Sequence, residues 1–153
     1  MISLPAAESR AGWKRVIPVH KPMKSIELKR KVRWADTDAS GRIYYARIFD
    51  YAGEGEWELL HSLGVSRKEL GKTYDFPRVH AECHFRKMLE LGNCFTLRFW
   101  PGRLGRTSIR YNFEVIIDES PQEKAAEGSV TIVVLHFGKP APIPPEIRAA
   151  FAD

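Results

Sequence analysis

One helical pattern followed by four strand patterns is the feature that most constrains the fold of this chain. Residues 44–63 carry apolar side chains near helical spacing. These positions are Ile48, Ala52, Leu59, Leu60 and Leu63, with Phe49 and Trp57 adding bulk. Strand and helix patterns do not alternate as they do in βαβ units. We therefore expect an antiparallel sheet with one long helix packed against it, an α+β architecture.

The strand patterns lie on both sides of this helix. Residues 26–34 alternate apolar and charged side chains, interrupted by Arg30, and predict a half-buried strand. Four more alternating segments follow Pro77, at residues 78–86, 95–100, 109–117 and 125–136. The apolar run 130–135 predicts burial of the last strand on both faces. Residues 23–153 thus form one domain, preceded by a flexible, proline-containing arm at 1–22.

Punctuation residues refine the helical region. Gly53 and Gly55 lie inside the helix, where each costs about 1 kcal/mol relative to alanine. We interpret them as points where a neighbouring backbone comes close. Gly64 is placed to end the helix. Ser66 and Glu69 form a capping-box pattern that predicts a further short turn of helix.

Composition restricts the class of protein. The chain has 153 residues, of which 44% are hydrophobic and 28% charged, as in ordinary globular domains. No apolar run approaches the roughly 20 residues of a membrane helix. Residues 1–16 contain no apolar core of a secretory signal. Cys83 and Cys94 are too few for a disulfide framework and lack metal-site spacing, so we expect a reducing, cytoplasmic location.

The charge balance suggests an anionic partner. Lysine and arginine number 24 against 19 acidic residues, which gives a net charge of +5. A nucleic acid or a phosphate-bearing small molecule would fit this excess, and so would solubility alone.

The joint between the first strand and the helix carries two acids, Asp36 and Asp38, followed by Gly41. A helix N-terminus offers free backbone N–H groups, and a carboxylate beside it can act as a base or a nucleophile. The same residues also suit a simpler role, in which the acids cap the helix or stabilise the turn.

The segment Asp36 to Tyr45, with this element order, resembles the hotdog fold of the 4-hydroxybenzoyl-CoA thioesterase family. The similarity extends over residues 26–147 and includes the closing pattern at 143–148. The resemblance implies an antiparallel sheet of five to six strands wrapped around one long central helix. It also implies that Asp38 is the catalytic carboxylate and that the backbone N–H of Tyr45, at the helix start, polarises the thioester carbonyl. We interpret Asp36 as an acid that stabilises the turn.

A basic, hydroxyl-rich turn at residues 103–108 matches the turn that holds the CoA phosphates in the family. The resemblance implies that Arg106, Thr107 and Ser108 bind CoA, whereas the residues alone fit a solvated hairpin turn equally well. Two positions depart from the family pattern. Tyr45 replaces the histidine of many relatives. An acid inside the helix is replaced by Gly53, with Glu54 adjacent.

The resemblance therefore implies that the chain is an acyl-CoA thioesterase, which releases free acid and CoA and uses Asp38 as nucleophile or general base. The acyl group is open, and an aromatic one such as 4-hydroxybenzoyl is a candidate. Trp34, Phe76 and Trp100 could line its site or simply fill a core. No cofactor, metal, nucleic acid or membrane is expected, and the chain should form a homodimer or homotetramer. The alternatives are a hotdog dehydratase, against which Tyr45 argues, and a non-catalytic acyl-CoA binding module.

A second polar pattern, His80, Glu82 and His84, falls on one strand face and invites a zinc interpretation. No further ligand completes such a site, so we interpret it as the polar side of a strand. Cys83 points to the opposite face and is expected in the core. No Gly-x-Ser-x-Gly elbow, P-loop or dinucleotide fingerprint is present.

Overall fold

The computed structural model describes residues 24–152, so the predicted arm at 1–22 lies outside the described residues. The strands are β1 (Ile26–Lys31), β2 (Arg78–Phe85), β3 (Cys94–Leu104), β4 (Ser108–Ile117), β5 (Lys124–Val133), β6 (Leu135–His136) and β7 (Lys139–Pro140). The helices are η1 (Trp34–Asp36), α1 (Arg47–Ser62), α2 (Arg67–Leu70) and α3 (Pro145–Phe151). The predicted order of strand, long helix and four strands is confirmed.

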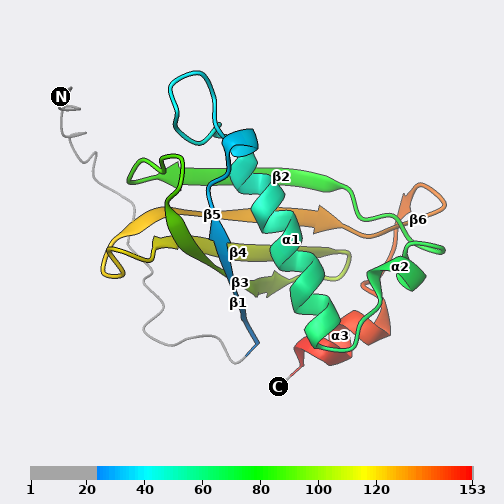
Figure 1. The fold of residues 1–153 in the computed structure, drawn as a ribbon. Coiled ribbons are helices and arrows are strands. Elements are labelled where there is room, and N and C mark those ends of the chain that lie inside the picture. The colour runs from blue at the N-terminus through cyan, green and yellow to red at the C-terminus, as the bar shows by residue number, and fades with distance from the viewer. Residues whose placement is uncertain (1–23, 153) are drawn as a thin grey trace, which may run out of the picture.

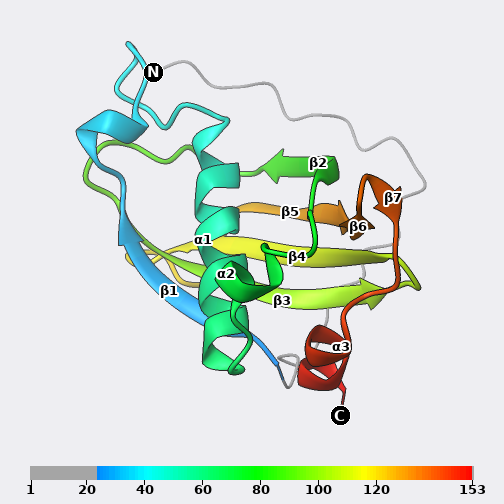
Figure 2. The ribbon, with the colours of Figure 1, turned by 90° about the vertical axis from the view of Figure 1, so that its right-hand side faces the viewer.

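Five strands form one antiparallel sheet in the order β1-β3-β4-β5-β2. Helix α1 crosses one face of this sheet, and the strands curve around it (Figures 1 and 2). Strands β6 and β7 form a separate two-stranded ladder. This is the α+β hotdog architecture, with the one long central helix that the sequence predicted.

The core lies between α1 and the inner face of the sheet. Alternate residues of β3, namely Phe95, Leu97 and Phe99, are fully buried, and alternate residues of the neighbouring strand β4 are buried beside them. The helix buries Ile48, Ala52, Leu59 and Leu60 against them, as its spacing predicted. The period-two and helical patterns therefore meet in one hydrophobic layer.

The two helix glycines differ in their surroundings. A Cβ atom built on Gly55 would lie 2.8–2.9 Å from three side-chain atoms of Phe99 on β3. A Cβ atom on Gly53 would meet nothing within 4 Å. Gly55 is therefore closely packed, but against a side chain and not against the backbone that we expected, and the expectation for Gly53 is wrong.

Several predicted boundaries also move. The first strand ends at Lys31, and Trp34 lies in η1 with 81% of its surface exposed. Helix α1 begins at Arg47 rather than at residue 44. The apolar run 130–135 is not buried on both faces, because buried and half-buried residues alternate along it. The short helix α2 is confirmed, and the Ser66 hydroxyl accepts the Glu69 N–H at 3.2 Å.

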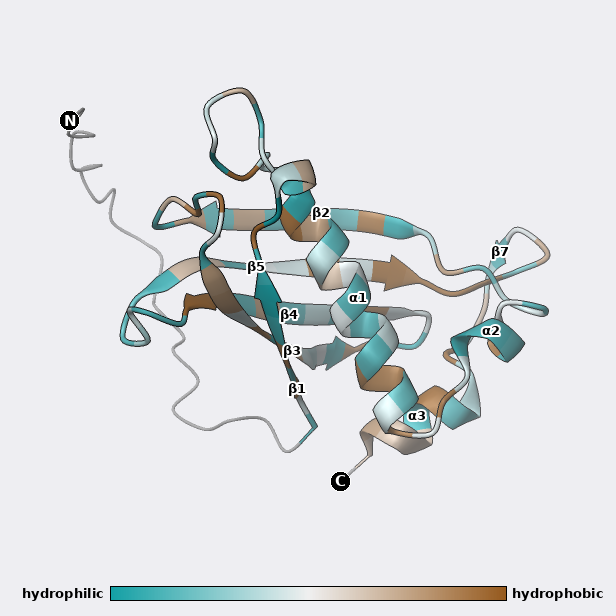
Figure 3. Cartoon of the chain, viewed as in Figure 1, coloured by the Kyte–Doolittle hydropathy of each residue, from teal (hydrophilic) through white to brown (hydrophobic). Residues whose placement is uncertain are grey.

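The two edge strands of the sheet have different character. Strand β1 presents the run Lys29, Arg30 and Lys31, and Figure 3 shows the hydrophilic colour along much of it. Strand β2 is paired only with β5 within residues 24–152, and its apolar face is largely exposed, with Cys83 half-buried. Val79 is 59% exposed and Phe85 48% exposed. Charged side chains on an edge oppose further strand pairing, whereas an apolar edge such as β2 favours it.

No helix among the described residues is long and apolar enough to cross a membrane.

Candidate active site

The segment between η1 and α1 forms a closed loop. The N–H of Tyr44 donates to the carbonyl of Asp36 at 2.8 Å, and the next residues into the loop, Thr37 and Ile43, form a β-bridge. The N–H of Asp38 donates to the carbonyl of Arg42 at 2.9 Å. Figures 1 and 2 both show this loop extending beyond the free edge of β2. The loop therefore has a defined base and an exposed tip.

Asp38 lies in the exposed part of this loop. Its Oδ1 accepts the Ser40 N–H at 2.8 Å and the Ser40 hydroxyl at 2.5 Å. These hydrogen bonds, the one from the hydroxyl first, hold the pKa of the Asp38 carboxyl below its usual value. Asp38 is thus ionised at neutral pH, and its other oxygen accepts no hydrogen bond from the residues that the structure describes. The geometry suits a turn-stabilising acid and also a carboxylate available for chemistry.

Tyr45 lies in the turn before α1, not at its first residue. Ala46 occupies the N-cap position, and the carbonyls of Tyr44, Tyr45 and Ala46 accept the first N–H groups of the helix. Within residues 24–152, the N–H groups of Tyr45 and Ala46 donate to no protein acceptor. The helix start that the resemblance implied at Tyr45 is thus two residues too early, but the N–H expected to be the oxyanion donor has no protein acceptor among residues 24–152.

Asp36 has a larger structural role than the sequence indicated. It is 2% exposed, and its Oδ2 accepts the Tyr51 hydroxyl at 2.6 Å and the Arg33 N–H at 2.9 Å. Burial opposes its ionisation, but the hydrogen bonds from Tyr51 and Arg33 outweigh burial and hold the pKa of Asp36 below its usual value. One signal could have revealed this cluster. Tyr51 places a hydroxyl on the apolar face of the helix, where it needs a buried partner.

The predicted CoA-binding turn lies at the other end of the sheet. Lys31 pairs with Cys94, so β1 delivers the Asp38 loop to the start of β3. Arg106 and Thr107 follow the end of β3, roughly 30 Å further along at about 3.3 Å per residue. The side chains of Arg106, Thr107 and Ser108 make no hydrogen bond with any other residue that the structure describes. One copy of the chain therefore does not bring this turn to Asp38.

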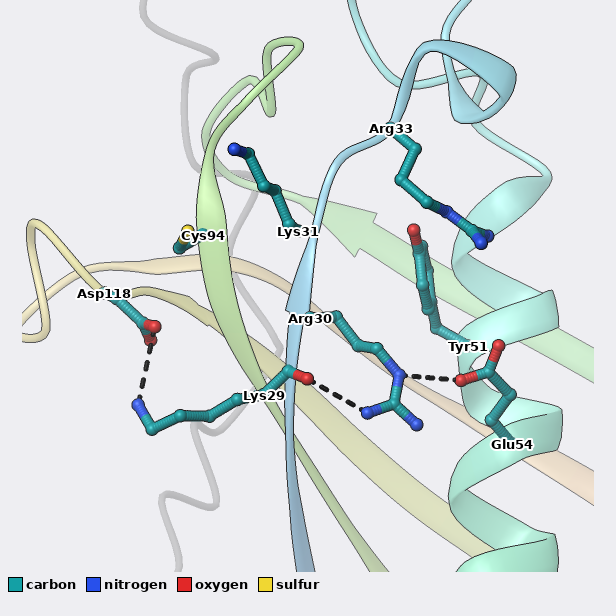
Figure 4. A pocket seen from close by; sticks show the side chains of 8 residues that line it. All are labelled: Lys29, Arg30, Lys31, Arg33, Tyr51, Glu54, Cys94 and Asp118. Carbon is teal, nitrogen blue, oxygen red and sulfur yellow. Dashed lines mark hydrogen bonds and ion pairs between the residues drawn. The ribbon is translucent and has the colours of Figure 1, made fainter.

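Glu54, the acid next to Gly53 in α1, faces β1. Its Oε2 accepts the Arg30 Nε–H at 2.8 Å, and both side chains line a pocket of about 590 Å³ beside β1 (Figure 4). Lys29, Lys31, Arg33, Tyr51, Cys94 and Asp118 complete this lining. Asp38, Tyr45 and the 106–108 turn are not part of it. This pocket and the candidate chemical groups are thus separate.

The other polar and aromatic candidates have structural partners. Glu82 accepts the Ser129 hydroxyl at 2.8 Å and an Arg110 N–H at 2.7 Å, and no metal-binding group of three or more ligands occurs among the described residues. Phe76 is buried beneath the guanidinium of Arg67, 3.8 Å from its ring centroid. Cys83 is half-buried and packs against the core, as expected.

Comparison with known proteins places the chain in a family. Residues 32–151 match the model of the Thioesterase-like superfamily. A 1,4-dihydroxy-2-naphthoyl-CoA hydrolase from Prochlorococcus marinus is 31% identical over 101 residues, which are 60% of this chain and 67% of that protein. The corresponding hydrolase from Nostoc punctiforme is 28% identical over 110 residues, 71% of this chain and 74% of that protein.

Solved structures agree in fold. A 1,4-dihydroxy-2-naphthoyl-CoA thioesterase from Synechocystis superimposes with a TM-score of 0.79 at 22% identity, covering 84% of this chain and 96% of that one. A gentisyl-coenzyme A thioesterase superimposes with a TM-score of 0.75 at 28% identity, covering 83% of this chain and all of that one (100%). With the family match over most of its length, the chain belongs to the Thioesterase-like superfamily and is a thioesterase of the hotdog type.

Proposed function

We propose that this thioesterase hydrolyses an aromatic acyl-CoA to the free acid and CoA, with Asp38 as nucleophile or general base. The observation that carries the proposal is the loop itself, which combines an ionised, exposed carboxylate with the unpaired N–H of Tyr45. The named relatives act on dihydroxynaphthoyl-CoA and gentisyl-CoA, whose acyl groups are both aromatic.

The chemistry requires few groups. In the general-base route, Asp38 takes a proton from water as the water oxygen adds to the thioester carbonyl; in the nucleophilic route, the Asp38 carboxylate adds to it directly. In both routes the tetrahedral oxyanion accepts the Tyr45 N–H. The C–S bond then breaks and CoA leaves as a thiolate, since a thiol has a pKa of about 8.5 and needs little help to depart. In the nucleophilic route, water hydrolyses the resulting mixed anhydride and regenerates the Asp38 carboxylate.

Exposed aromatic side chains beside the loop support an aromatic acyl group. The rings of Tyr44 and Tyr45 lie 4.9 Å apart between centroids, and both side chains are exposed. Trp34 is exposed on the other flank of the loop. Exposed rings on this loop and on the adjoining η1 would provide stacking surfaces for a planar acyl group. Phe76, which is covered by Arg67, would not contribute.

A second copy of the chain would complete the site. The exposed apolar face and free edge of β2 fit antiparallel pairing with β2 of another copy. Arg78 pairs with Ile132, and Ile132 with Ile109, so β2 starts at the sheet end that carries the 106–108 turn. A two-fold axis through the β2 edge would therefore place that turn of one copy at the Asp38 end of the other. We expect a homodimer at least, with residues of both copies at each site.

Thiol release from an acyl-CoA panel tests the proposed activity. The purified protein should hydrolyse aromatic acyl-CoA esters faster than short and long aliphatic ones. The absence of thiol release from every ester, with CoA binding retained, would instead identify a non-catalytic binding module. Turnover of aliphatic esters alone would overturn the aromatic assignment.

Two variants test Asp38. Asp38→Ala should abolish turnover in a protein with normal folding, and near-normal turnover would show that Asp38 only stabilises the loop. Ser40→Ala removes the hydroxyl that lowers the Asp38 pKa, so the acid limb of kcat/KM should move to higher pH. An unmoved acid limb would show that Asp38 does not control it.

The CoA-binding role of the 106–108 turn is tested by substrate affinity. Arg106→Ala should raise KM more than it lowers kcat, and removal of the CoA 3′-phosphate should have the same effect. Arg110→Ala is the matched control, because Arg110 is an exposed arginine already paired with Glu82. Unchanged KM with both Arg106→Ala and the dephosphorylated substrate would count against the assignment.

A further inference from the structure

Asp36, whose carboxylate is buried, is hydrogen-bonded to three separate segments of the chain. Its Oδ2 accepts the hydroxyl of Tyr51 from α1, at 2.6 Å. The same oxygen accepts the backbone N–H of Arg33, at 2.9 Å, and the Arg33 Nε–H, at 3.3 Å. The main-chain carbonyl of Asp36 accepts the N–H of Tyr44, at 2.8 Å. The end of β1, the helix and the residue before Tyr45 are thus hydrogen-bonded to one residue.

These contacts lie at the base of the loop that carries the proposed catalytic groups. Asp38 is two residues beyond Asp36 on one side of the base, and Tyr45 follows Tyr44 on the other. The loop tip is exposed, and its own hydrogen bonds run mainly within the loop and to the 89–91 segment. The separation between the Asp38 carboxylate and the Tyr45 N–H therefore depends on how the base is held.

Tyr51 connects this base to the rigid part of the molecule. Its ring is buried and packs edge-on against Phe95 of β3, with 5.0 Å between the centroids. Figure 4 shows Tyr51 on α1 and Arg33 beyond the end of β1 extending toward one another. A hydrogen bond from such a fixed ring gives Asp36 a position relative to the sheet as well as to the loop.

We propose that Asp36, held by Tyr51, is a positioning residue that sets the Asp38 carboxylate and the Tyr45 N–H at the separation needed for thioester hydrolysis. This inference rests on the proposed function. Asp36 is too buried to touch substrate, so it acts through the loop. A misplacement of about 1 Å in reacting groups can cost on the order of a hundredfold in rate.

Tyr51→Phe tests the inference, because it removes one hydroxyl and leaves the ring packed on Phe95. We expect kcat to fall roughly tenfold to a hundredfold, with KM and the inhibition constant of free CoA unchanged. Asp36→Asn, which keeps an oxygen to accept the Tyr51 hydroxyl, should retain more activity than Asp36→Ala. Tyr111→Phe is the matched control and should keep wild-type kcat, since Tyr111 is also fully buried and its hydroxyl has no partner among residues 24–152.

A double variant separates positioning from a general loss of structure. If Asp36 and Tyr51 act through their shared hydrogen bond, Asp36→Asn with Tyr51→Phe should lower kcat little more than the more damaging single change. Wild-type kcat in Tyr51→Phe, beside inactive Asp38→Ala, would overturn the positioning role and leave the proposed function intact. A wild-type protein inactive on every ester would overturn the proposed function itself. A fall in folded protein with kcat per folded site unchanged would show a merely structural role.

Discussion

Alanine substitution at the two glycines of α1 should change stability in different ways, although the glycines lie two residues apart. A methyl group at Gly55 would lie 2.8–2.9 Å from Cγ, Cβ and Cδ2 of Phe99. The Cβ atom of Phe99 is fixed by strand β3, so no rotamer change relieves the contact. The ring is also fixed, since Phe99 is buried and stacks on Tyr111 with 5.2 Å between centroids. The helix and strand backbones must therefore move apart.

The magnitudes follow from two opposing effects. Replacing a helix glycine by alanine stabilises the helix by about 1 kcal/mol. Gly53→Ala should receive this gain in full, because nothing lies within 4 Å of the added Cβ. Gly55→Ala receives the same gain but adds an overpacking cost of about 1–3 kcal/mol. The two variants should thus differ by about 1–3 kcal/mol in free energy of unfolding, with Gly53→Ala the more stable.

Thermal and urea unfolding at one fixed protein concentration measure this difference, since pairing of copies would make stability concentration-dependent. For a chain of this size, 1 kcal/mol corresponds to roughly 2–4 °C in Tm, so the variants should separate by roughly 2–12 °C. Equal Tm values would show that the α1–β3 contact relaxes freely around the methyl group. A less stable Gly53→Ala would show that Gly53 is packed in the assembled protein.

Three further outcomes test the site and its surroundings. Tyr45→Pro removes the proposed oxyanion N–H and should lower kcat by roughly 10²–10³ in the thiol-release assay. Tyr45→Ala removes only the ring and should retain most of kcat. Equal losses of kcat in the two variants would show that the side chain, and not the N–H, is responsible. Burial raises the pKa of the Cys83 thiol to about 11, so little of it is the reactive thiolate at pH 8. In a Cys94→Ala variant, iodoacetamide at pH 8 should therefore label Cys83 far more slowly in the folded protein than in the urea-unfolded protein, measured by mass spectrometry. Folding lowers the pKa of Asp36, so its carboxylate stabilises the fold above the unfolded pKa of about 3.9, and this contribution is lost as the pH falls through the folded pKa. In urea unfolding between pH 7 and pH 3, the free energy of unfolding should therefore fall less in Asp36→Asn than in the wild type.

The sequence predicted the elements well because most of them bury one face. Period-two runs became β1 to β5, and the helical spacing became α1 with its buried stripe. The start of the helix was misplaced because the N–H of Tyr44 is bonded to Asp36, a contact that local propensity does not register. The alternating pattern of β2 correctly predicted one apolar face, yet Val79 and Phe85 on that face are exposed. Alternation indicates that a face is to be buried, and does not say whether the same chain buries it.

The two acids of the joint show the same limit at the site. Their local sequences are alike, and what separates them is the hydroxyl of Tyr51, fifteen positions beyond Asp36. Only the packing of α1 against the sheet brings that hydroxyl to Asp36 and leaves Asp38 at the surface. The turn at residues 106–108, for which we propose CoA binding, presents a second case. Strand β1 pairs with β3, which does not follow it in the chain, and this pairing sends the loop and the turn to opposite ends of the sheet. If both serve one reaction, as proposed, they would come from different copies, and pairing of two copies through the free β2 edge would bring them together.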